Sequence, residues 1–171
     1  MQCLTEPEAS AWLRQRTIPE DPYHRDERPP FYLQFHAPAP FRRTDAWVRQ
    51  YWKRIIPGAD AMVHMTDWGL YEQSEMIAVM GIRNSQGESR PLIEAPAHIV
   101  TAEACETGIG LFSLSVSFEW SSYLYSPMNR STLYNWEGAI LDFWTDSEEA
   151  LAEMRRLVEE FGLEEALQGN P

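Results

Sequence analysis

Apolar residues recur with the period of an α-helix in the segment TDAWVRQYWKRIIPG, residues 44–58. Basic and amide side chains fill the opposite helical face. Thr44 is suited to cap the helix, and Pro57 with Gly58 is suited to end it. We therefore predict a helix over residues 44–56 that turns its apolar face to the core. That face consists of Trp47, Val48, Tyr51, Trp52, Ile55 and Ile56.

A second helix is predicted near the N-terminus, over residues 6–16. Thr5 precedes it as an N-cap, and acidic residues follow in the first turn, where the helix dipole favours negative charge. The next segment, residues 17–30, contains four prolines. Because proline cannot donate a backbone hydrogen bond, we interpret this segment as a linker without helix or central strand.

The last third of the chain ends in another helical pattern, TDSEEALAEMRRLVEEFG, residues 145–162. Leucine, methionine, valine and phenylalanine line one face of this segment. Thr145 and Glu148 have the spacing of a capping box, and Gly162 is suited to the position just after the helix. We predict a helix between these residues.

Other segments favour β-strands because they are short, rich in β-branched and aromatic residues, and bounded by turn-forming residues. The turn-forming sequence NSQGE at residues 84–88 predicts a hairpin with a strand on either side. Gly138 is placed where a β-bulge would fit within a long final strand. The predicted strands are residues 31–37, 61–68, 74–83 and 131–144. Residues 74–83 are ambiguous, since Glu75, Met76 and Ala78 favour a helix whereas Ile77, Val79 and Ile82 favour a strand, and the predicted hairpin turn decides for the strand.

Two periods compete between residues 101 and 120. Residues 112–120 alternate between large apolar side chains and serine or glutamate, which is typical of a half-buried strand. Gly108 and Gly110 also disfavour a helix, by about 1 kcal/mol each. The competing helical face would be formed by Ala102, Cys105, Ile109, Phe112 and Val116. The pattern alone favours the strand.

Four motifs in the middle of the chain resemble a group of uncharacterised bacterial proteins with D-W-G and E-A-P-G-H motifs, for which no activity is established. They are TDWGLYEQSE, IRNSQGESRPLIEAPAHIV, FEWSSYLY and NWEGAILDFW, and the resemblance covers residues 61–160. It implies a helix over residues 101–118 followed by a strand over residues 120–125. Ala97 and Ser121 depart from the pattern, which has glycine and aspartate at these positions.

Taken together, these segments predict one α+β domain spanning residues 1–171. We expect a mixed or antiparallel sheet of five or six strands with four helices packed mainly on one face. Two cysteines are too few for a disulfide framework. The chain contains no apolar run of about 20 residues and no signal-peptide layout at its start, so we expect a cytoplasmic protein. The oligomeric state is left open.

Charge is distributed unevenly along the chain. The net charge is −12, and residues 61–171 carry five basic and eighteen acidic side chains, a net charge of −13. Such a field repels nucleic acid and attracts a basic protein partner. An acidic surface that serves only solubility is the alternative interpretation.

Aromatic side chains are concentrated between residues 118 and 136, where six of nineteen residues are aromatic. Alternate residues of a strand point to opposite faces, so about half of these side chains should enter the core and half should form a surface patch. Tyrosine and tryptophan are enriched in protein-binding surfaces. The candidate partner-binding residues are Trp120, Tyr123, Tyr125, Tyr134, Trp136 and Glu137.

A smaller set of residues could instead line a pocket for a small molecule. Glu94 and His98 lie on either side of the segment Ala95-Pro96-Ala97 and could act as an acid–base pair. Asp67 lies at the end of a predicted strand and could line the same pocket. The histidines are scattered, and the chain lacks a glycine-rich phosphate loop, so we predict no metal and no cofactor.

Two functional hypotheses follow. The first is a non-enzymatic acidic protein that binds or inhibits a basic protein, such as a bacterial immunity protein that neutralises a toxin. The second is a small-molecule enzyme or ligand-binding domain with a pocket around His98.

Overall fold

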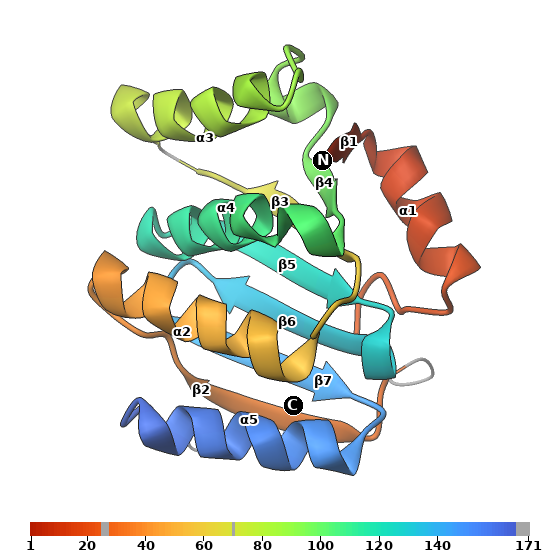
Figure 1. Ribbon diagram of the computed structural model, residues 1–171, viewed down its shortest axis with the longest axis vertical. Coiled ribbons are helices and arrows are strands. Elements are labelled where there is room, and N and C mark those ends of the chain that lie inside the picture. Colours follow the sequence, from red (N-terminus) through yellow and green to blue (C-terminus); the bar gives the residue numbers. More distant parts are fainter. Residues whose placement is uncertain (25–27, 70, 167–171) are drawn as a thin grey trace.

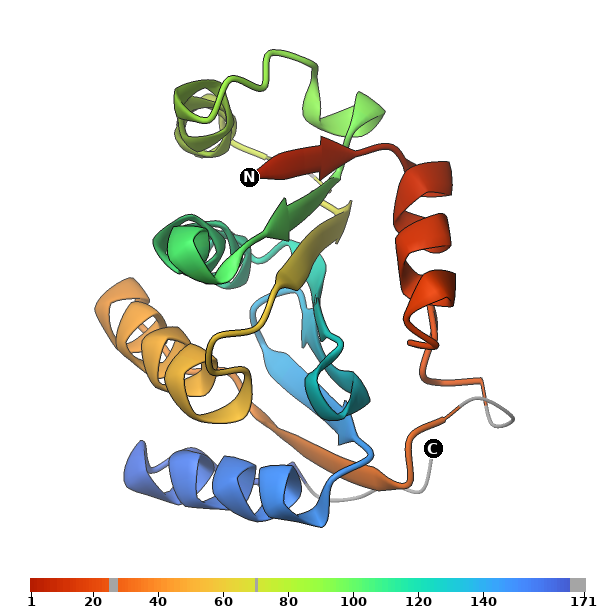
Figure 2. The ribbon, with the colours of Figure 1, turned by 45° about the vertical axis from the view of Figure 1, so that its right-hand side comes forward.

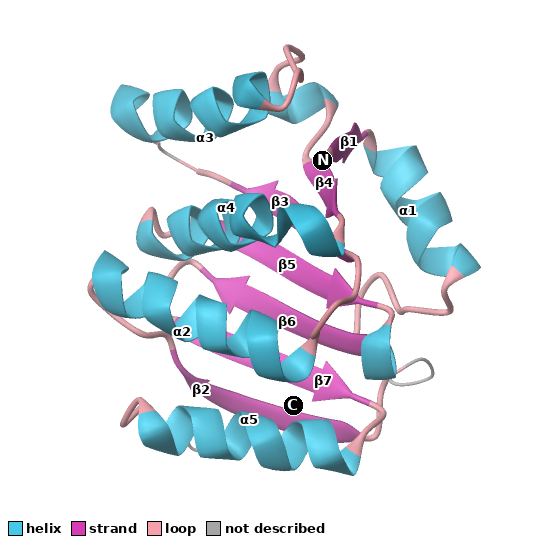
Figure 3. Ribbon diagram, viewed as in Figure 1, coloured by secondary structure: helices cyan, strands magenta, loops and turns pink. Residues whose placement is uncertain are grey.

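The computed structural model describes residues 1–24, 28–69 and 71–166. The described part of the chain contains one seven-stranded sheet, in which all neighbouring strands are antiparallel (Figures 1 and 3). The strand order is β1-β4-β3-β5-β6-β7-β2. The strands are β1 (Gln2–Leu4), β2 (Phe31–His36), β3 (Ala61–Asp67), β4 (Ala97–Val100), β5 (Ser121–Ser126), β6 (Ser131–Trp136) and β7 (Ile140–Thr145). The α+β class is confirmed, with more strands than the five or six predicted.

Five α-helices accompany the sheet, one more than predicted. They are α1 (Glu6–Gln15), α2 (Phe41–Ile55), α3 (Gln73–Ser85), α4 (Cys105–Ser117) and α5 (Glu148–Glu160). Helices α2, α4 and α5 cover one face of the sheet, and α1 packs on the opposite face (Figure 2). None of the helices in the described ranges has the length and apolarity needed to span a membrane.

Helix α2 has the predicted apolar face, and the six side chains of that face are buried, the last of them Ile56 at the C-cap. It begins at Phe41, one turn earlier than predicted, because the carbonyl of Pro40 already accepts the N–H groups of Arg43 and Thr44. Thr44 therefore does not cap the helix. Its hydroxyl instead donates to the carbonyl of Pro38 at 2.5 Å.

The predicted strand over residues 74–83 and its hairpin are wrong, because this segment forms α3. Glu72 and Glu75 make a reciprocal capping box at its start, a helix signal that the β-branched residues masked. The turn-forming residues at 84–88 end the helix. The N–H of Gly87 donates to the carbonyl of Asn84 there.

The implied helix over residues 101–118 is confirmed as a short 3₁₀ turn, Ala102–Ala104, followed by α4. Gly108, which disfavours a helix by propensity, is required by packing. A Cβ at this position would lie 2.4 Å from Cη2 of Trp52 in α2. The missing side chain therefore lets the two helices approach closely, and this contact outweighs the local cost of glycine.

The predicted long strand over residues 131–144 is wrong, because it is divided into β6 and β7 by a tight turn. Glu137 and Gly138 both have positive φ, 45° and 69°, and the N–H of Ala139 donates to the carbonyl of Trp136 at 2.8 Å. Two central residues with positive φ are typical of a type I′ hairpin turn. Gly138 therefore serves the turn and not a bulge.

Helix α5 is capped by Ser147, not by Thr145, since the hydroxyl of Ser147 accepts the N–H of Ala150 at 3.1 Å. The predicted stop at Gly162 is confirmed by its positive φ of 55° and by the bond from the N–H of Leu163 to the carbonyl of Val158. In the predicted linker, residues 17–24 and 28–30 contain no helix or strand.

Candidate functional site

The face of the sheet opposite α2, α4 and α5 is rich in aromatic side chains. Cross-strand pairing aligns His64, Tyr123, Tyr134, Asp142 and Gln34 in one row over five strands. In the next row Thr132 of β6 pairs with Tyr125 of β5 and with Trp144 of β7. Trp144 also pairs with Tyr32 of β2. We call this surface the aromatic face. Its aromatic side chains are Tyr32, Tyr123, Tyr125, Tyr134, Trp136 and Trp144.

Asp142 is the centre of this surface, a fully buried carboxylate with four hydrogen-bond donors. Oδ1 accepts the hydroxyl of Tyr32 at 2.5 Å and Nε2 of Gln34 at 2.8 Å. Oδ2 accepts the hydroxyl of Tyr23 and Nε1 of Trp136, the latter at 2.6 Å. With both oxygens engaged, the carboxylate is suited to hold its neighbours in place and not to abstract a proton.

Tyr23 comes from the proline-rich segment and joins it to the sheet. Burial raises the pKa of its hydroxyl, and the negative charge of Asp142 raises it further. The pKa of Tyr32 is raised for the same reasons. Both hydroxyls therefore remain protonated and donate to Asp142. The Tyr23 ring meets the Trp144 ring edge to face at 4.8 Å, so the segment is fixed by packing as well.

Several carboxylates lie near the aromatic face. Besides burial, the charges of Asp67 and Glu137 raise the pKa of Tyr134, and the charge of Asp21 raises the pKa of Tyr123. A cation also lies at one end, where the guanidinium of Arg28 is 5.1 Å from the ring centroid of Tyr32. The surface near Tyr123 and Tyr134 is therefore both aromatic and acidic.

The structure separates the predicted partner-binding residues into two groups. Trp136 is 45% exposed, Glu137 is exposed beside it, and Tyr123 and Tyr134 are half-buried with stacked rings 4.2 Å apart. These four residues lie together and remain candidates, and we call them the accessible patch.

Trp120 and Tyr125 are not accessible to a partner in this fold. Trp120 is 2% exposed and packs in the core beside Phe118, because it precedes β5 on the side covered by α4. Tyr125 points to the aromatic face as the strand alternation predicts, but α1 and its following segment cover it. Its hydroxyl donates to the carbonyl of Glu20 at 2.7 Å.

The structure does not assemble a catalytic pocket from Asp67, Glu94 and His98. His98 is fully buried, with Nδ1 bonded to the carbonyl of Val63 at 3.1 Å and Nε2 to Nη1 of Arg83 at 2.7 Å. Both ring nitrogens are therefore occupied. Asp67 accepts the N–H of Gly69 in an exposed turn, and Glu94 is exposed on a 3₁₀ turn.

The buried histidine predicts a dependence of stability on pH. Burial and the charge of Arg83 lower the pKa of His98 to about 3 in the fold, whereas the unfolded value is 6.5. The unfolded state therefore binds the proton more readily between pH 6.5 and pH 3, and stability decreases as the pH falls through that range. We expect a loss of about 1.4 kcal/mol per pH unit below pH 6.5 in urea unfolding experiments.

Measurements between pH 7 and pH 5 avoid most carboxylate titration and isolate this effect. In His98→Gln, which retains hydrogen-bonding capacity without a titrating ring, the free energy of unfolding should change less over the same interval. An identical pH profile in the two proteins would show that His98 is not the source.

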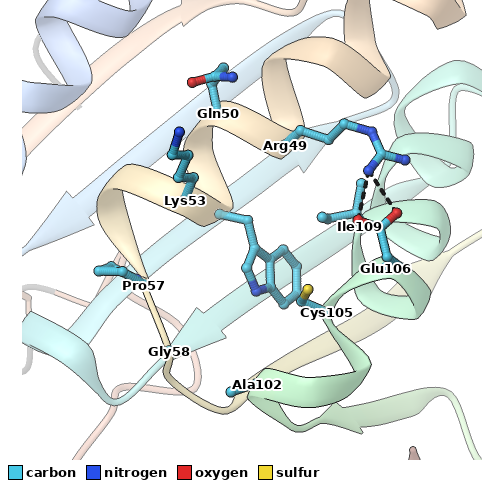
Figure 4. A pocket seen from close by; sticks show the side chains of 10 residues that line it. Arg49, Gln50, Lys53, Pro57, Gly58, Ala102, Cys105, Glu106 and Ile109 are labelled. Carbon is cyan, nitrogen blue, oxygen red and sulfur yellow. Dashed lines mark hydrogen bonds and ion pairs between the residues drawn. The ribbon is translucent and has the colours of Figure 1, made fainter.

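A cavity of about 380 Å³ opens between α2 and α4 (Figure 4). Nη1 of Arg49 crosses from α2 to the carboxylate of Glu106, at 2.8 and 2.6 Å. Nε of Arg49 also bonds Asp45 at 2.8 Å. Because these charges compensate one another, the excess negative charge of the chain is not concentrated at this cavity.

Several residues that form the aromatic face or pack on it were not predicted as site residues, among them Tyr23, Tyr32, Asp142 and Trp144. Asp142 had a signal in the sequence, since it is the one charged residue within the apolar run AILDFW. Tyr23 had none, because its position in a proline-rich segment does not indicate which surface that segment covers.

Comparisons with protein-family models, with curated proteins and with solved structures yield no match. In the described parts of the chain, no group of three His, Cys, Asp or Glu side chains is arranged to hold a metal ion.

Proposed function

We propose that this protein binds a basic protein partner through its aromatic face and thereby restrains that partner, as a bacterial immunity protein restrains a toxin. The observation that carries this proposal is the accessible patch, in which stacked tyrosines and an exposed tryptophan lie near the carboxylates of Asp67 and Glu137. Aromatic side chains are frequent binding anchors, and carboxylates complement the lysines and arginines of a basic partner.

The patch is suited to this role because it is held rigid before any partner binds. Trp136 donates from Nε1 to the buried Asp142, and its ring meets the Tyr134 ring at 5.0 Å. Glu137 is fixed in the type I′ turn, and a Cβ on Gly138 would lie 2.3 Å from the carbonyl oxygen of Val116, so this turn lies tightly against the end of α4. Preorganised anchors lose little conformational entropy on binding.

Kinetics should separate the charge of the patch from its aromatic anchors. We expect Glu137→Lys to slow association several-fold at low ionic strength and by less at high ionic strength, since salt screens charges beyond about 8–10 Å. Tyr123→Ala should leave association nearly unchanged and speed dissociation about 10- to 100-fold, as expected for a buried anchor. Surface-binding kinetics with a partner recovered from native cells would provide both rates.

Glu159→Lys supplies a control with the same change in charge, because Glu159 is exposed on α5, on the other side of the sheet. It should alter association less than Glu137→Lys does. Association that is indifferent to salt, or equal effects of the two lysine variants, would count against recognition by the aromatic face.

A further inference from the structure

A cavity of about 400 Å³ lies in the part of the chain that connects β3 to β4. Helix α3 belongs to this part and lies next to α4, at the end of the sheet that carries β1 and β4 (Figure 1). The cavity is lined by Met76 and Met80 of α3 and by Ser89, Pro91, Leu92 and Ile93 of the segment that follows it. Its volume is near the lower end of the range of about 300–1,000 Å³ that is typical of small-molecule sites.

The lining of this cavity is almost entirely apolar. Trp68 and Tyr71, which precede α3, complete it, and no charged side chain of the described residues takes part. Only the hydroxyls of Tyr71 and Ser89 can form side-chain hydrogen bonds with a ligand.

The carboxylates that flank the lining in sequence are exposed or engaged in local hydrogen bonds. They are Asp67, Glu72, Glu75, Glu88 and Glu94. A charged ligand would therefore lose its hydration in this cavity without gaining a partner. A neutral ligand would not have this cost.

Exposed apolar side chains at the mouth of the cavity are a second sign of a ligand. Leu92 is buried, whereas the next residue, Ile93, is 75% exposed, and Tyr71 is 48% exposed. The described residues include five exposed large hydrophobic side chains, and two of them line this cavity. The cavity therefore reaches from the edge of the core to the surface. An apolar hollow with exposed apolar residues around it is typical of a binding site.

Arg83 holds the two walls of the cavity at a fixed separation. This residue is fully buried and lies on the same face of α3 as Met76 and Met80. Its Nη1 donates to the carbonyl of Ala95 at 2.7 Å, and its Nη2 donates to the carbonyl of Arg90 at 2.9 Å. A buried guanidinium without a carboxylate partner is costly, and an apolar side chain would let the walls close. The cavity is therefore formed before any ligand binds.

We infer that this cavity binds a neutral, mainly apolar small molecule of one or two rings. The unbranched methionine side chains adapt to the shape of a ring, and their sulfur atoms make favourable contacts with aromatic groups. Trp68 and Tyr71 can pack against a ring as well. Trp68, Met76 and Met80 pack against the core on the helix-covered face of the sheet, so the cavity is separate from the aromatic face. The inference goes beyond the proposed function and does not depend on it.

Methionine methyl groups provide a local measurement of binding. The protein, labelled with ¹³C at these methyl groups, would be titrated at pH 7 with 2-naphthol, a neutral two-ring molecule with one hydroxyl. We expect ring-current shifts at Met76 and Met80, with a dissociation constant of about 0.1–1 mM for a molecule of this size. Met128, between β5 and β6, and Met154, on α5, should not shift. The matched control, 2-naphthoate, has the same rings with a carboxylate and should bind at least about tenfold more weakly.

Two exposed isoleucines supply matched variants. Ile93 lines the cavity, whereas Ile77 is 71% exposed on α3 and does not line it. Ile93→Asp places a charge at the mouth, where the ligand would displace its water, and should weaken 2-naphthol binding about fivefold or more. Ile77→Asp makes the same change outside the cavity and should alter binding less than about twofold. Because both side chains are largely exposed, both variants should fold.

The inference is overturned if Met76 and Met80 do not shift at about 2 mM 2-naphthol, or if 2-naphthol and 2-naphthoate bind equally. Equal weakening by the two isoleucine variants would show that an extended apolar surface on α3 binds the probe, which contradicts a defined cavity. Shifts at Met128 or Met154 as large as those at Met76 and Met80 would show non-specific association and count against it equally.

Discussion

Replacing Trp52 by alanine is expected to lower the free energy of unfolding by about 3–5 kcal/mol. Trp52 is 5% exposed and belongs to the core between α2, α4 and the sheet. Its ring occupies the space that Gly108 leaves open on α4. The loss combines the transfer of the indole to water with a cavity that two neighbouring helices cannot close.

Urea unfolding of the two proteins, followed by circular dichroism, would measure this difference. Arg49→Ala is the control on the opposite face of the same helix. Its ion pairs with Asp45 and Glu106 are largely exposed, so its removal should cost less than about 1 kcal/mol. A larger loss for Arg49→Ala than for Trp52→Ala would contradict the packing of this helix.

Gly108→Ala tests the same contact from the other helix. Helix propensity favours alanine by about 1 kcal/mol, yet the added Cβ would meet the Trp52 ring at 2.4 Å. We expect a net loss of about 1–3 kcal/mol in the wild-type background. In the Trp52→Ala background the collision is absent, and the same substitution should be neutral or stabilising.

Sequence patterns predicted the helices whose apolar faces are long and regular. Helix α2 has five buried apolar side chains at helical spacing, and α5 combines such a face with Gly162 as its end signal. The prediction for residues 74–83 failed where two local signals compete. Ile77, Val79 and Ile82 suggested a strand, but the capping box of Glu72 and Glu75 fixes α3.

The hairpin of β6 and β7 was missed because its turn does not have the usual asparagine or aspartate before glycine. Glu137 adopts the left-handed conformation there, next to Gly138. Because this turn was not predicted, Asp142 was assigned to a single long strand over residues 131–144. Its position beside Tyr134 and Gln34 depends on cross-strand register, which a pattern along one strand does not contain.

Strand alternation does place the aromatic side chains of residues 118–136 on both faces of the sheet, but the predicted partner-binding set included Trp120, which lies in the core. Which of the outward side chains stay accessible depends on α1 and on the proline-rich segment. Tyr125 is covered by them and Tyr123 only in part. The local pattern does not indicate burial by a segment that is distant in the chain, and the contact between Tyr125 and Glu20 joins residues 105 positions apart.

Asp142→Asn is expected to loosen the whole aromatic face. An amide group at this position can accept hydrogen bonds through one atom only. The other atom carries two hydrogens and would face either the Tyr23 and Trp136 donors or the Tyr32 and Gln34 donors. Two donors that are at most partly buried then lose this acceptor, and each such loss costs about 1–3 kcal/mol where the donor is shielded from water.

Removal of a buried negative charge offsets part of this cost, since the four partners of Asp142 are all neutral. We expect a net decrease of about 2–4 kcal/mol in the free energy of unfolding by urea. Tyr23→Phe, which removes one donor and keeps the ring, should cost about 1 kcal/mol. Asp146→Asn changes an exposed carboxylate that pairs with Arg130, and should cost under about 1 kcal/mol.

The same substitution should also release the proline-rich segment, because Tyr23 is joined to the sheet through Asp142. Limited proteolysis under native conditions should therefore cleave within residues 17–30 faster in Asp142→Asn than in Asp146→Asn. If Asp142→Asn is as stable as the wild type and its segment is cleaved no faster, the four hydrogen bonds do not hold the face together. If cleavage accelerates while partner binding is unaffected, the partner does not use the surface that Asp142 organises.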